Sequence, residues 1–241
     1  MVAAKIIENK IARMKPSRIF TVDELGFPPH WRENVRIKLG RMVKSGQIEK
    51  GGRGKYYKPK ASVFGNIGPH QSEVLRDLMY DKGVLSGYIT GYAIWNKMGL
   101  TSQVSNAITV GTSHRHDPMK RGHYQVRFIM QANRITSASI PLLQILDSLK
   151  MIKQIPDTTV DRSAVILKKH IADLDAQKLR MLVKLSGKYP PRVRALLGAI
   201  LESAGNHDYT AEIKATLNPS TTYIIGLSKL SEVDLNNWNI E

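Results

Sequence analysis

Residues 31–58 read WRENVRIKLGRMVKSGQIEKGGRGKYYK, and this stretch decides the N-terminal fold. Its first half predicts a helix from about His30 to Lys44, because apolar side chains recur at helical spacing. Gly46 is a natural end for that helix. The second half has a glycine turn, Gly51-Gly52-Arg53-Gly54, between two short strand-like segments, which is typical of a β-hairpin. The helix residues expected to face a core are Trp31, Val35, Leu39 and Met42.

The residues before this stretch extend the pattern. Val2–Met14 has apolar residues at helical spacing, and Pro16 ends that helix. Ser17–Phe20 is predicted to pair as a short strand, and Thr21 with Glu24 forms a capping box that starts a second short helix. The order helix, helix, turn, basic helix, hairpin is that of a winged helix-turn-helix. We therefore predict such a domain over residues 1–60.

Positive charge is concentrated in the same region. The chain of 241 residues has 36 Lys and Arg against 20 Asp and Glu, a formal net charge of +16, and residues 1–60 hold 15 of the bases against 5 of the acids. A basic helix can enter the major groove of DNA, where Arg and Asn read base edges, and a glycine-rich hairpin can approach phosphates. A winged helix can also be a protein-interaction module with only non-specific DNA affinity, and this alternative stays open. The candidate DNA-binding residues are Arg18, Arg32, Asn34, Arg36, Lys38, Arg41, Arg53 and Lys55.

Composition excludes several other classes of protein. Apolar residues make up 42% of the chain, which is enough to bury a core. Cysteine is absent, so disulfide scaffolds, cysteine nucleophiles and cysteine-ligated metal centres are excluded. No apolar run resembles a signal peptide or a membrane span. We expect a cytoplasmic protein that does not enter a membrane.

The remaining chain predicts a second, mixed domain over residues 70–241, after a Pro- and Gly-rich linker over 58–69. Gln71–Tyr80 is predicted as a helix. A small sheet is expected within 84–130, where Ser105–Thr112 and Tyr124–Met130 are predicted as hairpin partners joined by a basic loop. Helices are expected within 139–204, and a closing hairpin over 210–227. The fold class is therefore α+β: a winged helix-turn-helix, then a mixed domain with a small sheet and a C-terminal helical bundle.

A second group of cations lies in this domain. Lys188, Arg192 and Arg194 stand at or near the start of a predicted helix, where the positive end of the helix dipole disfavours cations. An anionic partner at that point, either DNA phosphate or an acidic protein surface, would explain them; cations that simply reach solvent are the alternative. We expect them to form one basic patch with Arg115, Lys120 and Arg121 of the loop.

A family resemblance rests on residues 87–101, GYITGYAIWNKMGLT, on the apolar strand, basic loop and second strand that follow, and on the later stretches KYPPRVRALLGAILE and LNPSTTYIIGL. Together these resemble the AbiEi-type antitoxin and transcriptional regulator family over nearly the whole chain. Ala93-Ile94 and the bulky Trp95 depart from the family's small-residue pattern. The resemblance implies an autorepressor that binds double-stranded DNA at its own promoter, with half-sites of an inverted repeat about 10 bp apart or a multiple of that. It also implies neutralisation of a nucleotidyltransferase-like toxin from the same bicistronic abortive-infection system.

Enzymatic function has little support in the sequence. His114, His116 and Asp117, with His123 beyond, are residue types that bind zinc or manganese, and a metal-dependent nuclease is the alternative that they raise. The surrounding basic charge would repel a cation, however. No P-loop, dinucleotide fingerprint, zinc-protease motif or nucleophile elbow is present. We expect no catalytic activity, no metal and no cofactor.

Overall fold

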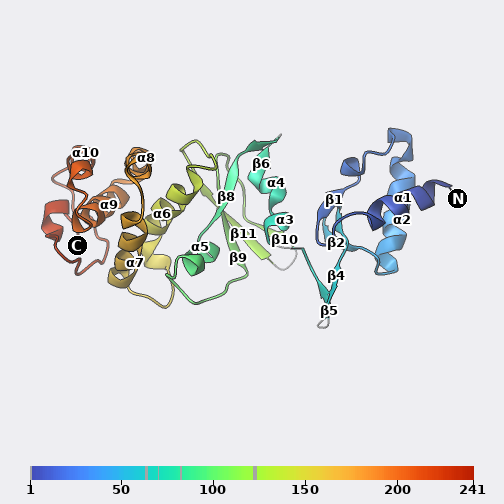
Figure 1. Ribbon diagram of the computed structural model, residues 1–241, viewed down its shortest axis with the longest axis horizontal. Coiled ribbons are helices and arrows are strands. Elements are labelled where there is room, and N and C mark those ends of the chain that lie inside the picture. The colour runs from blue at the N-terminus through green and yellow to red at the C-terminus, as the bar shows by residue number, and fades with distance from the viewer. Residues whose placement is uncertain (1, 63–64, 70, 82, 122–123) are drawn as a thin grey trace. The chain divides into compact units, whose positions relative to one another are not determined.

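The computed structural model describes residues 2–62, 65–69, 71–81, 83–121 and 124–241 (Figure 1). It divides into two compact units. The first unit comprises residues 1–79 and 120–124, and the second comprises residues 80–119 and 125–241. The fold is mixed α+β, as the sequence predicts, with N-terminal helices and a small sheet, a mixed four-stranded sheet, and a C-terminal helical region.

The first unit has the connectivity of a winged helix. Helix α1 (Val2–Ala12) is followed by strand β1 (Ile19–Thr21), helix α2 (Arg32–Lys44) and the hairpin of β2 (Glu49–Gly52) and β3 (Lys55–Tyr57). Strand β1 pairs antiparallel with β3, so the sheet order is β1-β3-β2. The capping box of Thr21 and Glu24 forms as predicted. It starts only a single 3-10 turn, η1 (Asp23–Leu25), in place of a full second helix.

The core of this unit is small. Val35, Leu39 and Met42 of α2 are buried, as their spacing predicts. Trp31 is only partly buried: it lies in a separate 3-10 turn, η2 (Pro29–Trp31), and stacks on Phe27 with ring centroids 5.8 Å apart. The other buried residues of this core are Ile7, Ile11, Phe20, Leu25 and Ile48.

Two segments of the first unit differ from the prediction. Residues 58–69 were expected to be an irregular linker, but they contain the antiparallel strands β4 (Lys60–Ser62) and β5 (Gly65–Ile67). The predicted helix over 71–80 is broken into α3 (Gln71–Val74) and α4 (Arg76–Met79). Leu75, at the break, is fully buried.

The sheet of the second unit corrects a prediction. Strand β8 (Gly87–Thr90) pairs antiparallel with β9 (Ala107–Thr112), but β9 pairs with β11 (Tyr124–Met130) in parallel, not as a hairpin. Adjacent parallel strands need a return connection between them. The basic loop supplies it and carries β10 (Met119–Arg121), so the sheet order is β10-β11-β9-β8. A two-stranded ribbon precedes this sheet, formed by β6 (Tyr80–Asp81) and β7 (Val84–Leu85).

The helices of the second unit include one buried helix, α9 (Pro191–Ser203). These helices are α5 (Tyr92–Lys97), α6 (Ile140–Lys150), α7 (Val160–Ala172), α8 (Ala176–Ser186) and α9, with a 3-10 turn, η3 (Ile152–Gln154), after α6. Residues 195–201 of α9 are all buried, which is the signature of a helix packed on every side. The four long helices agree with the positions that the sequence predicts within 139–204.

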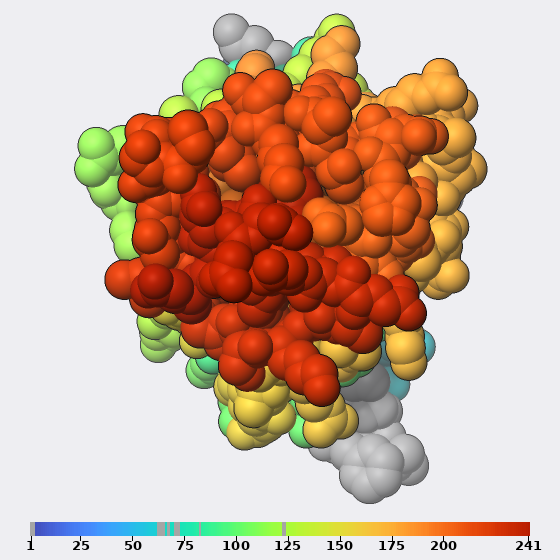
Figure 2. Space-filling view, turned by 90° about the vertical axis from the view of Figure 1, so that its left-hand side faces the viewer, coloured from blue at the N-terminus to red at the C-terminus, as the bar shows by residue number. Residues whose placement is uncertain are grey.

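The C-terminal segment does not form the predicted closing hairpin. Two 3-10 turns, η4 (His207–Tyr209) and η5 (Leu235–Trp238), and helix α10 (Thr210–Lys214) occupy it, and a single parallel bridge joins Tyr223 to Ile240. This segment covers one end of the unit (Figure 2). Its apolar side chains, including Trp238 at 1% exposure, pack on α9, so helix packing replaces strand pairing there.

Candidate nucleic-acid interface

Helix α2 presents three rows of residues away from its buried side. With 100° between successive residues, Arg32 and Arg36 lie on one flank, and Asn34 with Arg41 lies on the other. Lys38 shares the second flank, which borders a groove lined by Ala3, Ala4 and Ile7 of α1. Between the flanks lie Glu33, Ile37 and Lys44, all exposed. The predicted contact residues are therefore divided over two flanks of one helix.

Ion pairs hold several of these cations. Arg32 pairs with Asp23 at 3.2 Å, and Arg36 pairs with Glu33 at 3.8 Å; in both pairs each side chain is more than half exposed. Such exposed pairs contribute about 0–1 kcal/mol, so phosphate or base edges can displace the acids.

Lys38 is held differently. It pairs with Glu8 of α1 at 3.0 Å, and its side chain is only 19% exposed. This lysine therefore joins α1 to α2, and of the predicted residues on this helix it is the one least available to DNA. Arg41 is exposed, and within the described residues no ion pair joins it to an acid.

The hairpin presents Arg53 at its tip. Gly52 and Gly54 flank it with backbone φ angles of 147° and 70°. Residues that carry a side chain rarely adopt such angles, so the tight turn depends on glycine. Arg53 is exposed, and a shallow hollow lies beside it, lined by residues 50–54 and Tyr56. Arg53 is thus free to reach a phosphate.

Side-chain hydrogen bonds hold the base of this hairpin. The Tyr57 hydroxyl donates to Glu49 Oε2, and Asn66 Nδ2 donates to Glu49 Oε1 at 3.0 Å. Burial, together with the adjacent Glu49 carboxylate, raises the pKa of Tyr57 to about 12. The hairpin strands are therefore joined to β5, which positions the tip that carries Arg53.

Lys55 and Arg18 complete the predicted set. Lys55 Nζ lies 2.6 Å from Asp77 Oδ2 with 17% of its side chain exposed, and Arg121 lies 2.9 Å from the same oxygen. Lys55 and Arg121 thus both pair with the carboxylate of Asp77, which makes Lys55 less available to DNA. Arg18 is exposed just before β1.

The predicted second patch is divided between the units. Lys120 and Arg121 belong to the first unit, whereas Arg115, Lys188, Arg192 and Arg194 belong to the second. Lys188 Nζ donates to the backbone oxygen of Ala132 at 3.0 Å. The Nε atom of Arg194 is buried without a hydrogen-bond partner, and Arg192 lines a pocket that is described below.

Sequence reasoning missed two residues in the middle row of α2. Ile37 is 48% exposed, and Glu33 lies one turn before it. An exposed isoleucine on a basic helix can pack against a thymine methyl group, and a glutamate can accept a hydrogen bond from cytosine N4. The helical spacing of 33, 37 and 44 could have identified this row.

The loop that carries His114 and His116 is exposed. His114, Arg115, His116 and Asp117 are exposed, and the His116 ring stacks on Phe128 at 4.9 Å between centroids. His123 lies outside the described residues. Among the residues that the structure describes, no three His, Asp or Glu side chains come together as a metal-binding group.

None of the described helices is long and apolar enough to cross a membrane. No protein-family model matches the chain, and no curated protein matches it in sequence. Among solved structures, the chain is similar to the Rv2827c protein from Mycobacterium tuberculosis. The two share 10% sequence identity and a TM-score of 0.60 over 99% of this chain and 90% of that one. This similarity extends through both units and concerns the fold alone.

Proposed function

We propose that this chain is a sequence-specific DNA-binding protein that represses transcription from its own promoter. One observation carries the proposal: a winged-helix connectivity in which α2 and the β2–β3 hairpin both present exposed cations. Arg36 and Arg41 on the helix would read base edges, and Arg53 on the hairpin would contact phosphate. Two copies on an inverted repeat would place half-sites about 10 bp apart or a multiple of that.

A binding titration tests this proposal. Labelled duplex from upstream of the gene is compared with a shuffled duplex of the same composition by fluorescence anisotropy. Arg36→Ala should relax the preference for the upstream duplex, whereas Arg180→Ala, which replaces an exposed arginine on α8, should keep it. Equal affinity of the wild-type protein for both duplexes would favour the alternative, a protein-interaction module with only non-specific DNA affinity.

The proposal extends to antitoxin activity in a bicistronic abortive-infection system. Its support is the resemblance of residues 87–101, which form β8 of the four-stranded sheet and helix α5, to AbiEi-type regulators. The partner would be a nucleotidyltransferase-like toxin encoded next to this gene. Co-expression tests the idea: growth arrest by the neighbouring gene product should be relieved by the wild-type chain. Growth arrest that persists despite stable co-expression would contradict it.

The proposal assigns the chain no catalytic activity, no metal and no cofactor, and it places the protein in the cytoplasm. The metal-dependent nuclease remains the alternative. Incubating labelled duplex with the protein and Mn²⁺ distinguishes the two, since a repressor leaves the duplex intact and a nuclease degrades it.

A further inference from the structure

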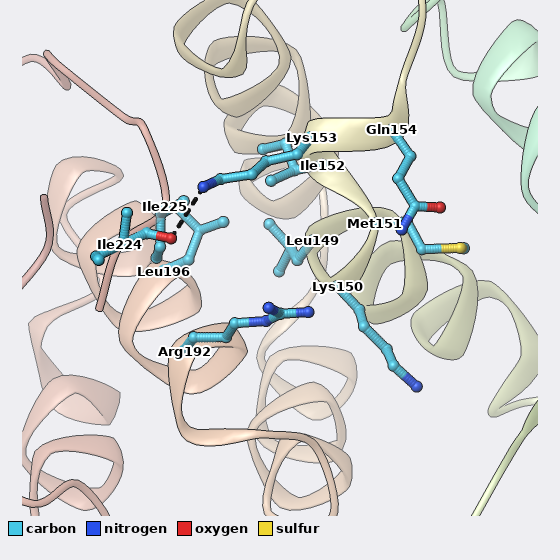
Figure 3. Close-up of a pocket in the computed structure, with 10 residues that line it drawn as sticks. All are labelled: Leu149, Lys150, Met151, Ile152, Lys153, Gln154, Arg192, Leu196, Ile224 and Ile225. Atoms are coloured by element: carbon cyan, nitrogen blue, oxygen red, sulfur yellow. Dashed lines mark hydrogen bonds between the residues drawn. The ribbon is translucent and has the colours of Figure 1, made fainter. Parts of the chain in front are cut away.

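A pocket of about 130 Å³ lies in the second unit, where three segments meet (Figure 3). The end of α6 and the turn η3 form one side, the first turns of α9 form the second, and Ile224 with Ile225 forms the third. All of these residues belong to one compact unit, so the pocket is built by a single packed region.

The charged groups of this pocket are all basic. Lys150, Lys153 and Arg192 line it, and no carboxylate is among its described lining residues. Lys153 Nζ donates one hydrogen bond, to the backbone oxygen of Ile224 at 3.0 Å, which leaves two of its three N–H donors. The guanidinium of Arg192 lies across the pocket toward Leu149 (Figure 3). No acceptor for it is found among the described residues.

Asp147, one turn before Lys150, interacts electrostatically with Lys150, but its hydrogen bonds are made to other residues. Its two carboxylate oxygens accept hydrogen bonds from Tyr88 at 2.7 Å and Tyr189 at 2.8 Å, and it is not one of the residues that line the pocket. Pro190 and Pro191 at the start of α9 lack N–H groups, so the donors of this pocket are mainly side chains. Lys153 and Arg192 carry like charges, and an anion in the pocket would offset their repulsion, whereas the Lys150 side chain points away from both (Figure 3).

Apart from the polar side chain of Gln154, the rest of the lining is apolar. A bare inorganic anion would leave these walls uncovered, whereas an anion that carries an apolar group would contact both parts of the pocket. The volume is close to that of a protein cavity known to hold benzene. The apolar lining residues are Leu149, Met151, Ile152, Leu196, Ile224 and Ile225.

We propose that this pocket binds a small organic carboxylate whose apolar body is about the size of a benzene ring. The planar guanidinium of Arg192 matches a carboxylate with two parallel N–H donors, and Lys153 adds a charge-assisted contact. The apolar body packs between Leu149, Leu196 and Ile225. The site shares no residue with the proposed DNA interface of the first unit, because every lining residue belongs to the second unit.

Isothermal titration calorimetry on the full chain tests the proposal, with benzoate as the probe. Benzamide is the neutral match of nearly the same shape, and inorganic phosphate is the bare anion. Benzoate should bind at least tenfold more tightly than either, since only benzoate satisfies both the cations and the walls. Benzamide or phosphate that binds as tightly as benzoate, or no benzoate binding up to about 10 mM, would overturn the proposal.

Variants identify the pocket as the site. Arg192→Met keeps a long apolar side chain and should weaken benzoate binding about tenfold. Lys153→Met should weaken it about threefold, because one of its donors is already used inside the protein. Arg162→Met, an exposed arginine on α7 away from the pocket, is the matched control and should leave binding unchanged. Unchanged thermal melting shows that each variant folds. Equal losses in the Arg162 and Arg192 variants would contradict the proposed site.

Discussion

In the first unit the polar side chains lie outside a small core, whereas in the second unit several lie inside a large one. The first core is made by short segments between Ile7 and Ile48. The second core includes most of α6 and α9 and encloses Asp147 at 1% exposure. The first unit therefore presents its charged side chains at the surface, whereas the second encloses polar side chains within a well-packed core. Substitutions of exposed cations in the first unit should therefore act on DNA binding, and substitutions inside the second core should act on stability.

The largest effect is expected for Asp147→Ala. Asp147 accepts hydrogen bonds from the hydroxyls of Tyr88 and Tyr189, and Gln131 Nε2 donates to both of these hydroxyls at 2.9 and 2.8 Å. Removing the carboxylate leaves the buried Tyr88 hydroxyl without its acceptor and leaves Tyr189 only the backbone oxygen of Leu143 at 3.5 Å, which should cost about 2–5 kcal/mol of unfolding free energy. Urea denaturation of the wild-type protein and of the Asp147→Ala variant measures this loss of unfolding free energy. A loss below about 1 kcal/mol would show that the network contributes little to stability.

The pH dependence of unfolding tests the same network. Burial raises the pKa of the Asp147 carboxyl above its usual range, although the tyrosine hydrogen bonds oppose this. Between the ordinary aspartate pKa and the raised value, the folded state binds more protons than the unfolded state. This group therefore makes the protein less stable as pH rises through that window. Asp147→Asn should remove this part of the pH dependence, and an unaltered profile would contradict the assignment.

A pair of glycine substitutions contrasts the two units directly. At Gly198 in α9, an added Cβ would lie 2.0 Å from the Trp238 ring, so Gly198→Ala should destabilise by about 1–3 kcal/mol. At Gly40 in α2, an added Cβ meets no atom within 4 Å. Gly40→Ala should therefore stabilise by about 0.5–1 kcal/mol, because alanine favours helices over glycine. Thermal melts of both variants measure these effects. If both substitutions shifted the melting temperature in the same direction, the predicted difference between the two glycine positions would be wrong.

Arg36→Ala should cost about 1–3 kcal/mol on the upstream duplex and relax its sequence preference, because this residue is expected to read a base edge. The ion pair of Arg36 with Glu33 is exposed, so protein stability should change by less than about 1 kcal/mol. Anisotropy titrations and melts separate the two effects. If affinity falls equally on shuffled DNA, Arg36 contacts phosphate and not bases.

The smallest effect is expected for Lys44→Ala at the end of α2. Lys44 is exposed and stands next to the C-terminal end of the helix, where it would touch phosphate at most. The substitution should weaken binding to upstream and shuffled duplexes alike, by less than 1 kcal/mol, and lower the salt dependence by about one unit of slope. A sequence-dependent loss would instead assign Lys44 to base readout.

The amino-acid pattern within a short segment predicted the features that depend on that segment alone. The spacing of Val35, Leu39 and Met42, the capping box at Thr21 and the glycine turn around Arg53 all anticipate the structure. The parallel pairing of β9 with β11 was not predictable in this way, because the direction of a strand depends on where its connection returns.

The predicted DNA-binding residues also depend on contacts that the sequence does not show. Lys38 and Lys55 read as free surface charges, but each meets an acid from a distant segment, Glu8 and Asp77 respectively. The basic pocket of the second unit also combines three segments, and the sequence signalled it only through cations at the start of a helix. Sequence spacing identifies the face of an element, whereas tertiary packing decides which residues meet across elements.

The most direct test of the central claim is a salt series of the wild-type chain on its upstream duplex and on the shuffled duplex. Anisotropy is measured between about 50 and 200 mM salt, over which phosphate contacts weaken steeply. If the first unit reads sequence through α2 and its wing, a clear preference for the upstream duplex persists at the higher salt. Equal binding that disappears on both duplexes as salt rises would contradict the account and reduce the interface to general electrostatic attraction.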